Sequence, residues 1–211
     1  QVVPARVPPS FSPIEADNGV RGDSTLEKLS SLAPAFDRSF GTITAGNSSF
    51  LTDGAAACLL MSAEKAEELG VTPLARVVSM SLVAMDPLEE LLLGPVASVP
   101  EALDAAEVPL GEVGVWEVHE AFAAPVLAFL KLLADKAWCR ERLGRKDAVG
   151  KIDPKKVNAW GGSLALGHPF GATGARLVTT CVERMEREGA GIGVVTTCAA
   201  GALGHAMVLA R

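Results

Sequence analysis

The sequence predicts an α/β fold in which helices flank a layered sheet. Strand-like runs alternate with helical segments of roughly 10 to 15 residues, a pattern typical of a sheet covered by helices. The last two strand-like runs, 191–197 and 202–209, are separated only by a tight turn rich in Ala and Gly, which predicts an antiparallel pair. With 211 residues, of which 49% are hydrophobic, the chain can bury a sizeable core.

The first 35 residues are predicted to be loop or linker, because prolines stand at positions 4, 8, 9, 13 and 34. A short helix is expected over 24–32, capped by Ser24 or Thr25. A buried strand is expected over 56–61. A helix over 62–69 should follow it, with Ser62 as the N-cap and Gly70 closing the last turn.

The remaining two thirds of the chain complete one core of about five strands and four helices. The charged stretch 138–156 is expected to lie on the surface. The expected elements are strands over 74–85, 113–118, 191–197 and 202–209, and helices near 100–107, 121–134 and 172–188.

Composition excludes several classes of function. The formal net charge is −6 and the basic residues are scattered, which argues against nucleic acid as the main partner. No run reaches the roughly 18 to 20 apolar residues of a membrane span, and the first ten residues lack a signal-peptide layout. A small anionic ligand remains compatible, because local dipoles rather than net charge would hold it.

The four cysteines favour a reducing compartment, since none forms a CxxC pair. Cys58 and Cys181 are expected to pack in the core. His119, His168 and His205 are too far apart in sequence to give a zinc-type ligand spacing, so no metal site is expected.

The stretch VWEVHEAFAAPVL is the first candidate for chemistry. A strand ends and a helix begins at His119, and residues at such junctions line ligand crevices in α/β sheets. His119 and Glu120 are therefore placed to face a substrate. The alternative is that His119 merely caps the helix.

The stretch WGGSLALGHPFGATGARLV is the second candidate. Glycines at 161, 162, 167, 171 and 174 surround His168, and the helix that starts after Gly171 directs its amide groups into the loop. The glycines are expected to make room for another molecule beside the ring. The alternative is a Gly-rich turn that carries a structural histidine.

The stretch VVTTCAAGALGHA is the third candidate. Cys198 ends a strand, and a thiol beside an imidazole can transfer protons if its pKa is lowered. His205, on the final strand, is interpreted as structural. Two histidines and a cysteine at one edge of the sheet indicate acid/base work on an activated carbonyl compound.

These motifs resemble the thiolase family. GNSSFLTDGAA, HEAF, GGSLALGHPFGATGARLV and CAAGALGHA occur in the family's order and spacing from about residue 41 to residue 211. HEAF, in place of the Asn-containing version of many thiolases, is most similar to the thiolase β-subunits of trifunctional β-oxidation enzymes. The resemblance implies a thiolase-like layered fold and cleavage of a 3-ketoacyl-CoA by CoA, with CoA as substrate and no cofactor.

The resemblance also implies roles for individual residues. His168 resembles the histidine that activates the nucleophilic thiol, Cys198 the acid/base cysteine, and His119 the residue that helps form an oxyanion site. Further positions matching the family are Ala200, whose amide would serve a second oxyanion hole, Ser49 at the pantetheine arm, and Ala121 and Phe122 beside the acyl thioester.

Two departures from the family pattern bear on activity. The family's nucleophilic cysteine lies in an N-terminal motif, and none of the four cysteines here stands in such a context. We therefore expect the isolated chain to be inactive. The expected division is the end of the loop domain over 1–50, the last piece of the N-terminal domain over 51–73, and the C-terminal domain over 74–211. The turn after Cys198 also carries Ala where the family is richer in Gly.

Rival functions and partners follow from the same residues. The alternatives are a decarboxylating ketoacyl synthase-like condensing enzyme and a non-catalytic acyl-CoA binding or assembly module. The resemblance implies a homodimer or higher homo-oligomer, an α-subunit of a trifunctional enzyme as a further partner, and a mitochondrial location, with the bacterial cytoplasm as the alternative.

Overall fold

The centre of the molecule is a four-stranded mixed sheet with the strand order β3, β6, β5, β4. The computed structural model describes residues 2–211. β6 pairs antiparallel with both β3 and β5, as the sequence predicts for the last two strands, whereas β4 runs parallel to β5. The four strands are β3 Arg76–Ala84, β4 Val115–Val118, β5 Ile192–Ala199 and β6 Leu203–Ala210.

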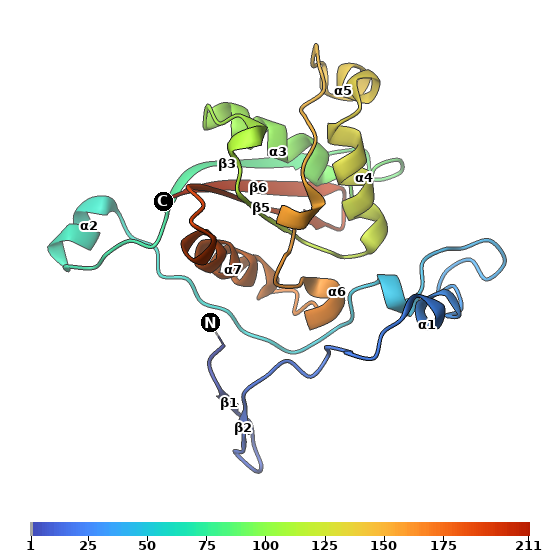
Figure 1. Ribbon diagram of the computed structural model, residues 1–211, viewed down its shortest axis with the longest axis horizontal. Helices are drawn as coiled ribbons and strands as arrows, with labels where there is room; N and C mark the ends of the chain where they lie inside the picture. Colours follow the sequence, from blue (N-terminus) through green and yellow to red (C-terminus); the bar gives the residue numbers. More distant parts are fainter. Residues whose placement is uncertain (1) are drawn as a thin grey trace.

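Helices cover both faces of this sheet (Figure 1). α3 and α4 lie on one face and α7 lies on the other. The α-helices are α1 Leu26–Ser30, α2 Ala63–Glu68, α3 Gly94–Ala105, α4 Ala123–Leu133, α5 Lys136–Leu143, α6 Ser163–Leu166 and α7 Thr173–Glu188. Short 3-10 turns occupy Ala45–Asn47, Leu110–Glu112 and Pro154–Lys156. The predicted α/β class, with a mixed sheet between helices, is confirmed.

The core has two layers because successive side chains of each strand point to opposite faces of the sheet. Trp116 of β4 and Val194 of β5 join the cluster under α3 and α4. Their sequence neighbours Val115 and Val195 join the cluster under α7. Successive strand residues point to opposite faces, so β4 and β5 are apolar on both sides because both sides are covered.

The backbones of α3 and β6 approach each other closely. A Cβ at Gly204 would overlap the backbone of Gly94, and a Cβ at Gly94 would overlap Gly204 in return. In addition, the Ser79 hydroxyl of β3 donates to the Ala102 carbonyl of α3 at 2.6 Å. The first turn of α3 therefore lies directly on the sheet.

The expected strand over 56–61 is absent. Residues 51–62 form no regular secondary structure and are mostly exposed, so the sheet of the described chain has four strands rather than about five. A strand needs a neighbour to satisfy its backbone groups, and none of the described strands pairs with this stretch. Cys58, expected in the core, is exposed, whereas Cys181 is buried as expected.

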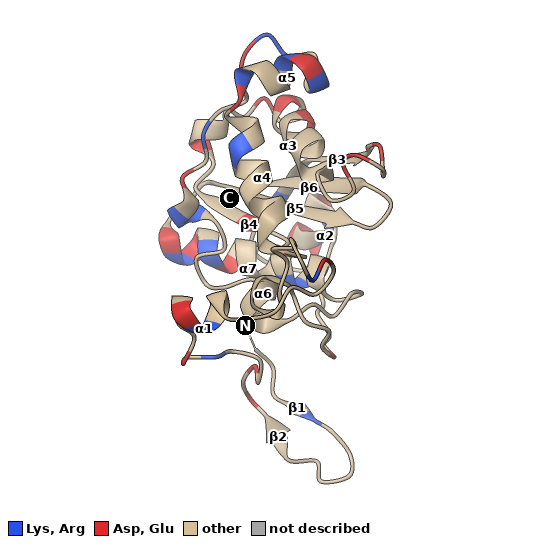
Figure 2. Cartoon of the chain, turned by 90° about the vertical axis from the view of Figure 1, so that its right-hand side faces the viewer, with Lys and Arg blue, Asp and Glu red and all other residues tan. Residues whose placement is uncertain are grey.

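Two helices differ from the sequence expectation. α3 begins at Gly94 with Pro95 in its first turn, so Pro100 stands inside the helix rather than at its start. α5 was missed within the charged stretch 138–156. Asp135 caps it by accepting from the Trp138 amide at 3.0 Å, and Gly144 ends it with a left-handed φ of 66°. Charges of both signs mark its surface (Figure 2).

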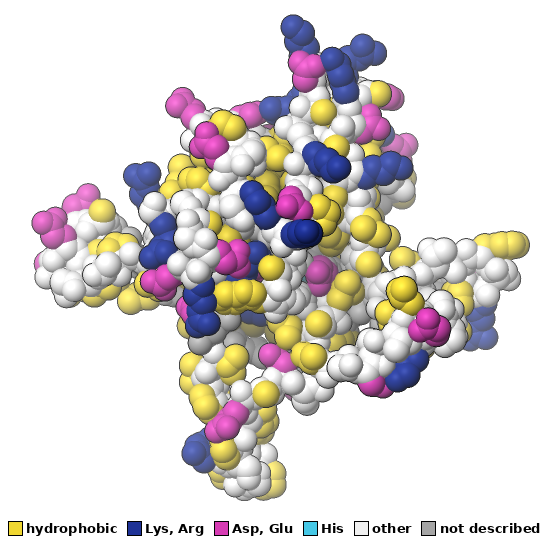
Figure 3. Space-filling model, in the orientation of Figure 1, with side chains coloured by type: hydrophobic (Ala, Val, Ile, Leu, Met, Phe, Trp, Pro, Cys, Tyr) yellow, Lys and Arg dark blue, Asp and Glu magenta, His cyan; other side chains and the backbone are white. Residues whose placement is uncertain are grey.

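Residues 2–62 form an arm that lies outside the sheet (Figure 1). The strands described in it are the two-residue pair β1 Ala5–Arg6 and β2 Pro13–Ile14, and α1 starts after Thr25, one of the two expected caps. Apolar side chains lie exposed along this arm (Figure 3), among them Val3, Phe11 and Phe40. Ser62 is the N-cap of α2 as predicted, with its hydroxyl accepting from the Lys65 amide. Among residues 2–211, no helix combines the length and apolar character needed to cross a bilayer.

Gly204→Ala should destabilise the fold, because the added methyl would meet backbone rather than a movable side chain. We expect a loss of about 3 kcal/mol in the free energy of unfolding, measured by denaturant titration. Gly111→Ala is the control, since a Cβ there meets nothing within 4 Å, and it should change stability by less than about 0.5 kcal/mol. Equal effects of the two changes would contradict the close approach of α3 and β6.

Candidate active site

Two imidazole rings from distant parts of the sequence meet at the carboxyl end of β4. His119 follows β4 directly, and its amide donates to the Thr196 carbonyl of β5 at 2.9 Å, which continues the parallel ladder by one residue. His168 lies in the loop between α6 and α7. The ring centroids are 4.2 Å apart at an interplanar angle of 44°. His119 is buried, whereas His168 is partly exposed.

His119 is not a helix cap. The N-cap of α4 is Phe122, three residues further on, and no side chain forms a cap hydrogen bond there. The His119 Nδ1 atom lies 3.1 Å from the Ser163 hydroxyl in the first turn of α6. The alternative that this ring merely starts the helix is therefore wrong.

A short piece of the N-terminal arm, residues 48–50, joins the two histidine segments. Ser48 forms an antiparallel bridge with Phe122, and the Ser49 amide donates to the Ala121 carbonyl at 3.0 Å. The next residue, Phe50, accepts from the His168 amide at 2.9 Å. We call residues 48–50 the strap. It places Ser49 against Ala121 and Phe122, three of the positions singled out in the sequence.

Asn158 and Glu120 hold the end of β4 in place. The Asn158 side chain donates to the Val118 carbonyl and accepts from the Val118 amide, both at 2.8 Å, so it replaces a missing strand neighbour. Its Nδ2 also donates to Glu120 at 2.7 Å. The second Glu120 oxygen accepts from the Leu164 amide of α6 at 3.1 Å. Glu120, expected to face a substrate, thus bridges two parts of the scaffold.

Other side chains of this protein occupy the space beside two of the glycines around His168. A Cβ at Gly162 would overlap the Glu120 carboxylate, and one at Gly167 would overlap the Thr52 side chain. The expectation that these glycines make room for another molecule is wrong for both positions. Around Gly161, Gly171 and Gly174 the space is open. Only these three leave room beside the loop.

A cleft of about 420 Å³ lies beside the His168 loop. Phe170, which stacks against the His168 ring at 4.5 Å between centroids, forms part of its wall. The opposite wall is the stretch after the strap. The lining residues are Thr52, Asp53, Gly54, Ala55, Ala56, Pro169, Phe170, Gly171 and Ala172.

Cys198 and Ala200 lie at the turn between β5 and β6. The Cys198 thiol is buried, and burial raises its pKa, which the backbone hydrogen bonds from Cys198 itself and from Ala121 only partly oppose. The lowered pKa considered from the sequence is therefore not found. Ala200 is exposed in the turn. Ala202, where the family is richer in glycine, is fully buried and adopts a left-handed φ of 59°. Ala121 therefore links Cys198 to the segment that follows His119.

Both imidazoles are held in the neutral form at pH 7. Burial lowers the pKa of His119 to about 4, and the charges of His168 and Arg176 add to this. Burial also lowers the pKa of His168, again with Arg176 adding to it. A neutral ring has one nitrogen that donates and one that accepts, so each histidine can either take a proton or donate a hydrogen bond.

The His168 ring is fixed by the first residue of α7. Its Nδ1 atom lies 2.7 Å from the Thr173 hydroxyl, and that hydroxyl donates to the Pro169 carbonyl at 3.1 Å. The Thr173 oxygen therefore accepts from Nδ1–H. The lone pair of His168 then lies on Nε2, the arrangement that a general base requires.

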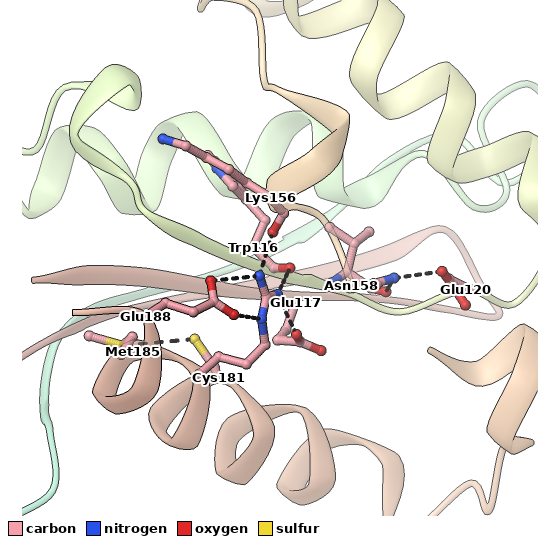
Figure 4. A network of polar contacts seen from close by, with 10 residues as sticks. Trp116, Glu117, Glu120, Lys156, Asn158, Cys181, Met185 and Glu188 are labelled. Carbon is pink, nitrogen blue, oxygen red and sulfur yellow. Dashed lines mark hydrogen bonds and ion pairs between the residues drawn. The ribbon is translucent and has the colours of Figure 1, made fainter. Parts of the chain in front are cut away.

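A buried ion pair anchors β4 to α7 beneath the site (Figure 4). Arg184 of α7 contacts Glu117 at 2.7 Å, donates to the Trp116 carbonyl at 3.2 Å, and also pairs with Glu188. Burial raises the pKa of Glu117 to about 7, against the opposing influence of Arg184. The Trp116 carbonyl also accepts from the Asn158 amide at 2.9 Å, so the ion pair and the Asn158 side chain hold β4 from two sides.

Comparison with known proteins identifies the family. The family model described as "Thiolase, C-terminal domain" matches residues 71–211, and "Thiolase, N-terminal domain" matches residues 1–64. The chain belongs to the thiolase family.

Among the described residues, no group of His, Cys, Asp and Glu is placed to hold a metal ion.

Individual thiolases match nearly the whole chain. "3-ketoacyl-CoA thiolase" of Yersinia enterocolitica is 48% identical over 209 residues, and that of Escherichia fergusonii is 49% identical over the same length. Each match covers 99% of this chain and 48% of the relative. The chain thus spans about half the length of the curated thiolases that it matches.

Solved thiolase structures share the fold. Bacillus anthracis acetyl-CoA acetyltransferase superposes with a TM-score of 0.85 at 35% identity, covering 100% of this chain and 49% of that one. Human mitochondrial 3-ketoacyl-CoA thiolase in complex with CoA superposes with a TM-score of 0.77 at 32% identity, covering 94% and 46%. The thiolase-like layered fold is confirmed.

Asn158→Ala should destabilise the protein by about 2–4 kcal/mol. The change leaves the Val118 amide without its partner, and alanine is disfavoured at the positive φ of 47°. Denaturant titration measures the loss. Asn18→Ala, at an exposed asparagine of the arm, is the control and should be near neutral. A near-neutral Asn158→Ala would contradict the anchoring of β4 by this side chain.

Acid should weaken the fold through His119. Because its folded-state pKa lies near 4 rather than 6.5, the folded state binds fewer protons than the unfolded state between these values. This contribution is complete above about pH 6.5 and is lost as the pH falls towards 4, by about 3 kcal/mol. His119→Gln should flatten this part of the stability profile, measured by urea unfolding from pH 7.5 to 4. Parallel profiles would contradict the burial of a neutral ring.

Proposed function

We propose that the intact protein carrying this chain is a 3-ketoacyl-CoA thiolase of fatty-acid β-oxidation. It would cleave a 3-ketoacyl-CoA with free CoA into acetyl-CoA and a shortened acyl-CoA. The observation that carries the proposal is the contact between His119 of HEAF and His168 of GHP. The matched relatives named 3-ketoacyl-CoA thiolase, which align with 99% of the chain, support the same activity.

The proposed roles follow the protonation states of the site. His168, with its lone pair on Nε2, takes the proton of the nucleophilic thiol, which then attacks the 3-keto carbon. Cleavage of the bond between C2 and C3 releases the acetyl-CoA enolate, which takes a proton from Cys198. The Cys198 thiolate then takes the proton of the incoming CoA thiol, and the CoA sulfur attacks the acyl thioester. The enzyme thiolate that this attack expels takes back the proton held by His168, so protons balance over one cycle.

The remaining site residues are proposed to bind. His119 donates a hydrogen bond to the thioester oxygen, and the Ala200 amide donates to a second oxyanion. Ser49 contacts the pantetheine arm of CoA, and Ala121 and Phe122 line the acyl thioester. The strap, which ties Ser49 to Ala121, supports their assignment to one site. A thiolase structure in complex with CoA supports CoA as the ligand.

The acyl-accepting thiol is proposed to come from outside the 211 residues. Cys139 and Cys181 are buried in helices and Cys58 is exposed on the irregular stretch, so none of these three lies with the paired rings. We retain the division at residues 50 and 73 as part of the proposal. The isolated chain should form no acyl adduct on any of its cysteines.

The proposed setting is the bacterial cytoplasm. The relatives from Yersinia enterocolitica and Escherichia fergusonii, at 48% and 49% identity, are bacterial, which supports this alternative rather than a mitochondrial location. Assembly into a homodimer or higher homo-oligomer, and association with a trifunctional α-subunit, remain proposals drawn from the family resemblance. The exposed apolar arm is compatible with burial against a further part of the protein.

Cys198→Ala should lower kcat for thiolysis of a 3-ketoacyl-CoA by about 10²- to 10⁴-fold, because the enolate loses its proton donor. Formation of acetyl-CoA by the intact protein measures the rate. The matched control is Cys139→Ala, which removes another buried thiol and should leave the rate within a few-fold.

Two results would overturn the proposed function. Decarboxylation of a malonyl thioester by an otherwise active Cys198→Ala protein would indicate a condensing enzyme of the ketoacyl synthase type. Binding of CoA without any turnover, lost on Ser49→Trp, would indicate an acyl-CoA binding module.

A further inference from the structure

Ser163 is a fully buried hydroxyl with two partners of different kinds. It opens α6, directly after the N-cap Gly162. His119 Nδ1 lies 3.1 Å from its oxygen, and Arg176 Nη2 of α7 lies 3.4 Å from it. Three segments distant in sequence therefore meet at this one oxygen.

The chemistry of the two partners fixes where the hydroxyl proton goes. A guanidinium only donates hydrogen bonds, so Ser163 Oγ is the acceptor towards Arg176. A buried hydroxyl also needs an acceptor for its own proton, and of the two side chains that contact this hydroxyl among the described residues only His119, through Nδ1, can accept. Nδ1 of His119 must then be unprotonated, and the proton of the neutral ring resides on Nε2.

Arg176 can act only as a hydrogen-bond donor towards Ser163. Its Nε and Nη1 atoms are buried without a hydrogen-bond partner among the described residues, and its Nη2 atom donates to Ser163. The carboxylates that act on it are Glu117, Glu120 and Asp17. An arginine stays charged in proteins, so it cannot exchange its donor role for an acceptor role.

Nε2 of His119 is free to act on another molecule. None of the described residues forms a hydrogen bond with it, and the ring lies against the partly exposed ring of His168. His168, which donates from Nδ1 to Thr173, has the opposite arrangement, with its lone pair on Nε2.

We propose that Ser163, oriented by Arg176, is a positioning residue that holds His119 as the tautomer protonated on Nε2. Two rings in contact then perform different tasks, since His119 donates a hydrogen bond and His168 accepts a proton. The consequence for catalysis rests on the proposed thiolase function, because the donor would serve a developing oxyanion. The tautomer itself is independent of that function.

The first test reads the tautomers directly. Two-bond ¹H–¹⁵N spectra of the intact protein, labelled with ¹⁵N in histidine, distinguish a protonated from an unprotonated ring nitrogen. His119→Gln, His168→Gln and His205→Gln each remove one set of signals and so assign the three rings of this chain. We expect His119 to be protonated on Nε2 and His168 on Nδ1. A His119 ring protonated on Nδ1 in the unaltered protein would overturn the proposal, and neutron diffraction gives the same answer from a crystal.

Variants test the cause. Ser163→Ala should give His119 a mixture of tautomers or the Nδ1–H form while leaving His168 unchanged. Arg176→Met should shift His119 in the same direction without touching the hydroxyl, and it serves where Ser163→Ala does not fold. The matched control is Ser98→Ala, which removes another fully buried hydroxyl that has no partner among the described residues. A His119 spectrum unaffected by both Ser163→Ala and Arg176→Met would overturn the proposal.

Activity supplies the second readout. Ser163→Ala should lower kcat by about ten- to hundredfold with KM changed less than about threefold, as is typical when a histidine loses its orienting partner. Ser98→Ala should leave both unchanged. If the unaltered protein performs no thiolysis, the proposed function fails, while the spectra still decide the tautomer. A shifted tautomer with unchanged kcat would overturn the catalytic part alone.

Discussion

The parallel pairing of β4 with β5 is the constraint on which the site depends. β4 has only four residues, and on its far side it lacks a full strand neighbour. Three separate devices compensate for this. The Asn158 amide replaces the missing ladder, Arg184 anchors the strand from below, and the His119 amide extends the pairing onto Thr196. The position of the His119 ring is thus determined by backbone and buried side chains, rather than by the loop that follows.

The chemistry of the site comes from desolvation rather than from charge pairing. Neither histidine faces a carboxylate that would favour an imidazolium, and Arg176 lies close enough to oppose one. Glu120, which follows His119 in the sequence, accepts hydrogen bonds at both oxygens, one from Asn158 and one from the Leu164 amide. The two adjacent rings are both neutral, and they differ in tautomer because Ser163 and Thr173 hold their protons on different nitrogens. One ring is the donor and the other the acceptor because of the direction of these hydrogen bonds, and no difference in charge is needed.

Much of the fold could be predicted from the sequence because its signals are local. The strand-like runs 191–197 and 202–209, separated by a tight turn rich in Ala and Gly, predicted β5 and β6, and the helical segment 172–188 predicted α7. The stretch 56–61 has the composition of a buried strand but no described neighbour, and pairing is a non-local property. α5 was missed because its charged surface conceals one buried residue, Cys139, and a cap at Asp135. The sequence pattern could predict that His119 and His168 share a sheet edge, but not that Ser163 and Asn158 support them.

The strap gives the site an unusual dependence on the N-terminal arm. Hydrogen bonds from residues 48–50 reach the backbone on either side, one at Ala121 and one at His168, so the strap acts as a spacer between the two ring-bearing loops. The arm itself has few buried side chains of its own. Any force that displaces the arm would therefore alter the gap between the rings before it disturbed the sheet. The distance between the His119 and His168 rings therefore depends on how firmly the strap is held in place.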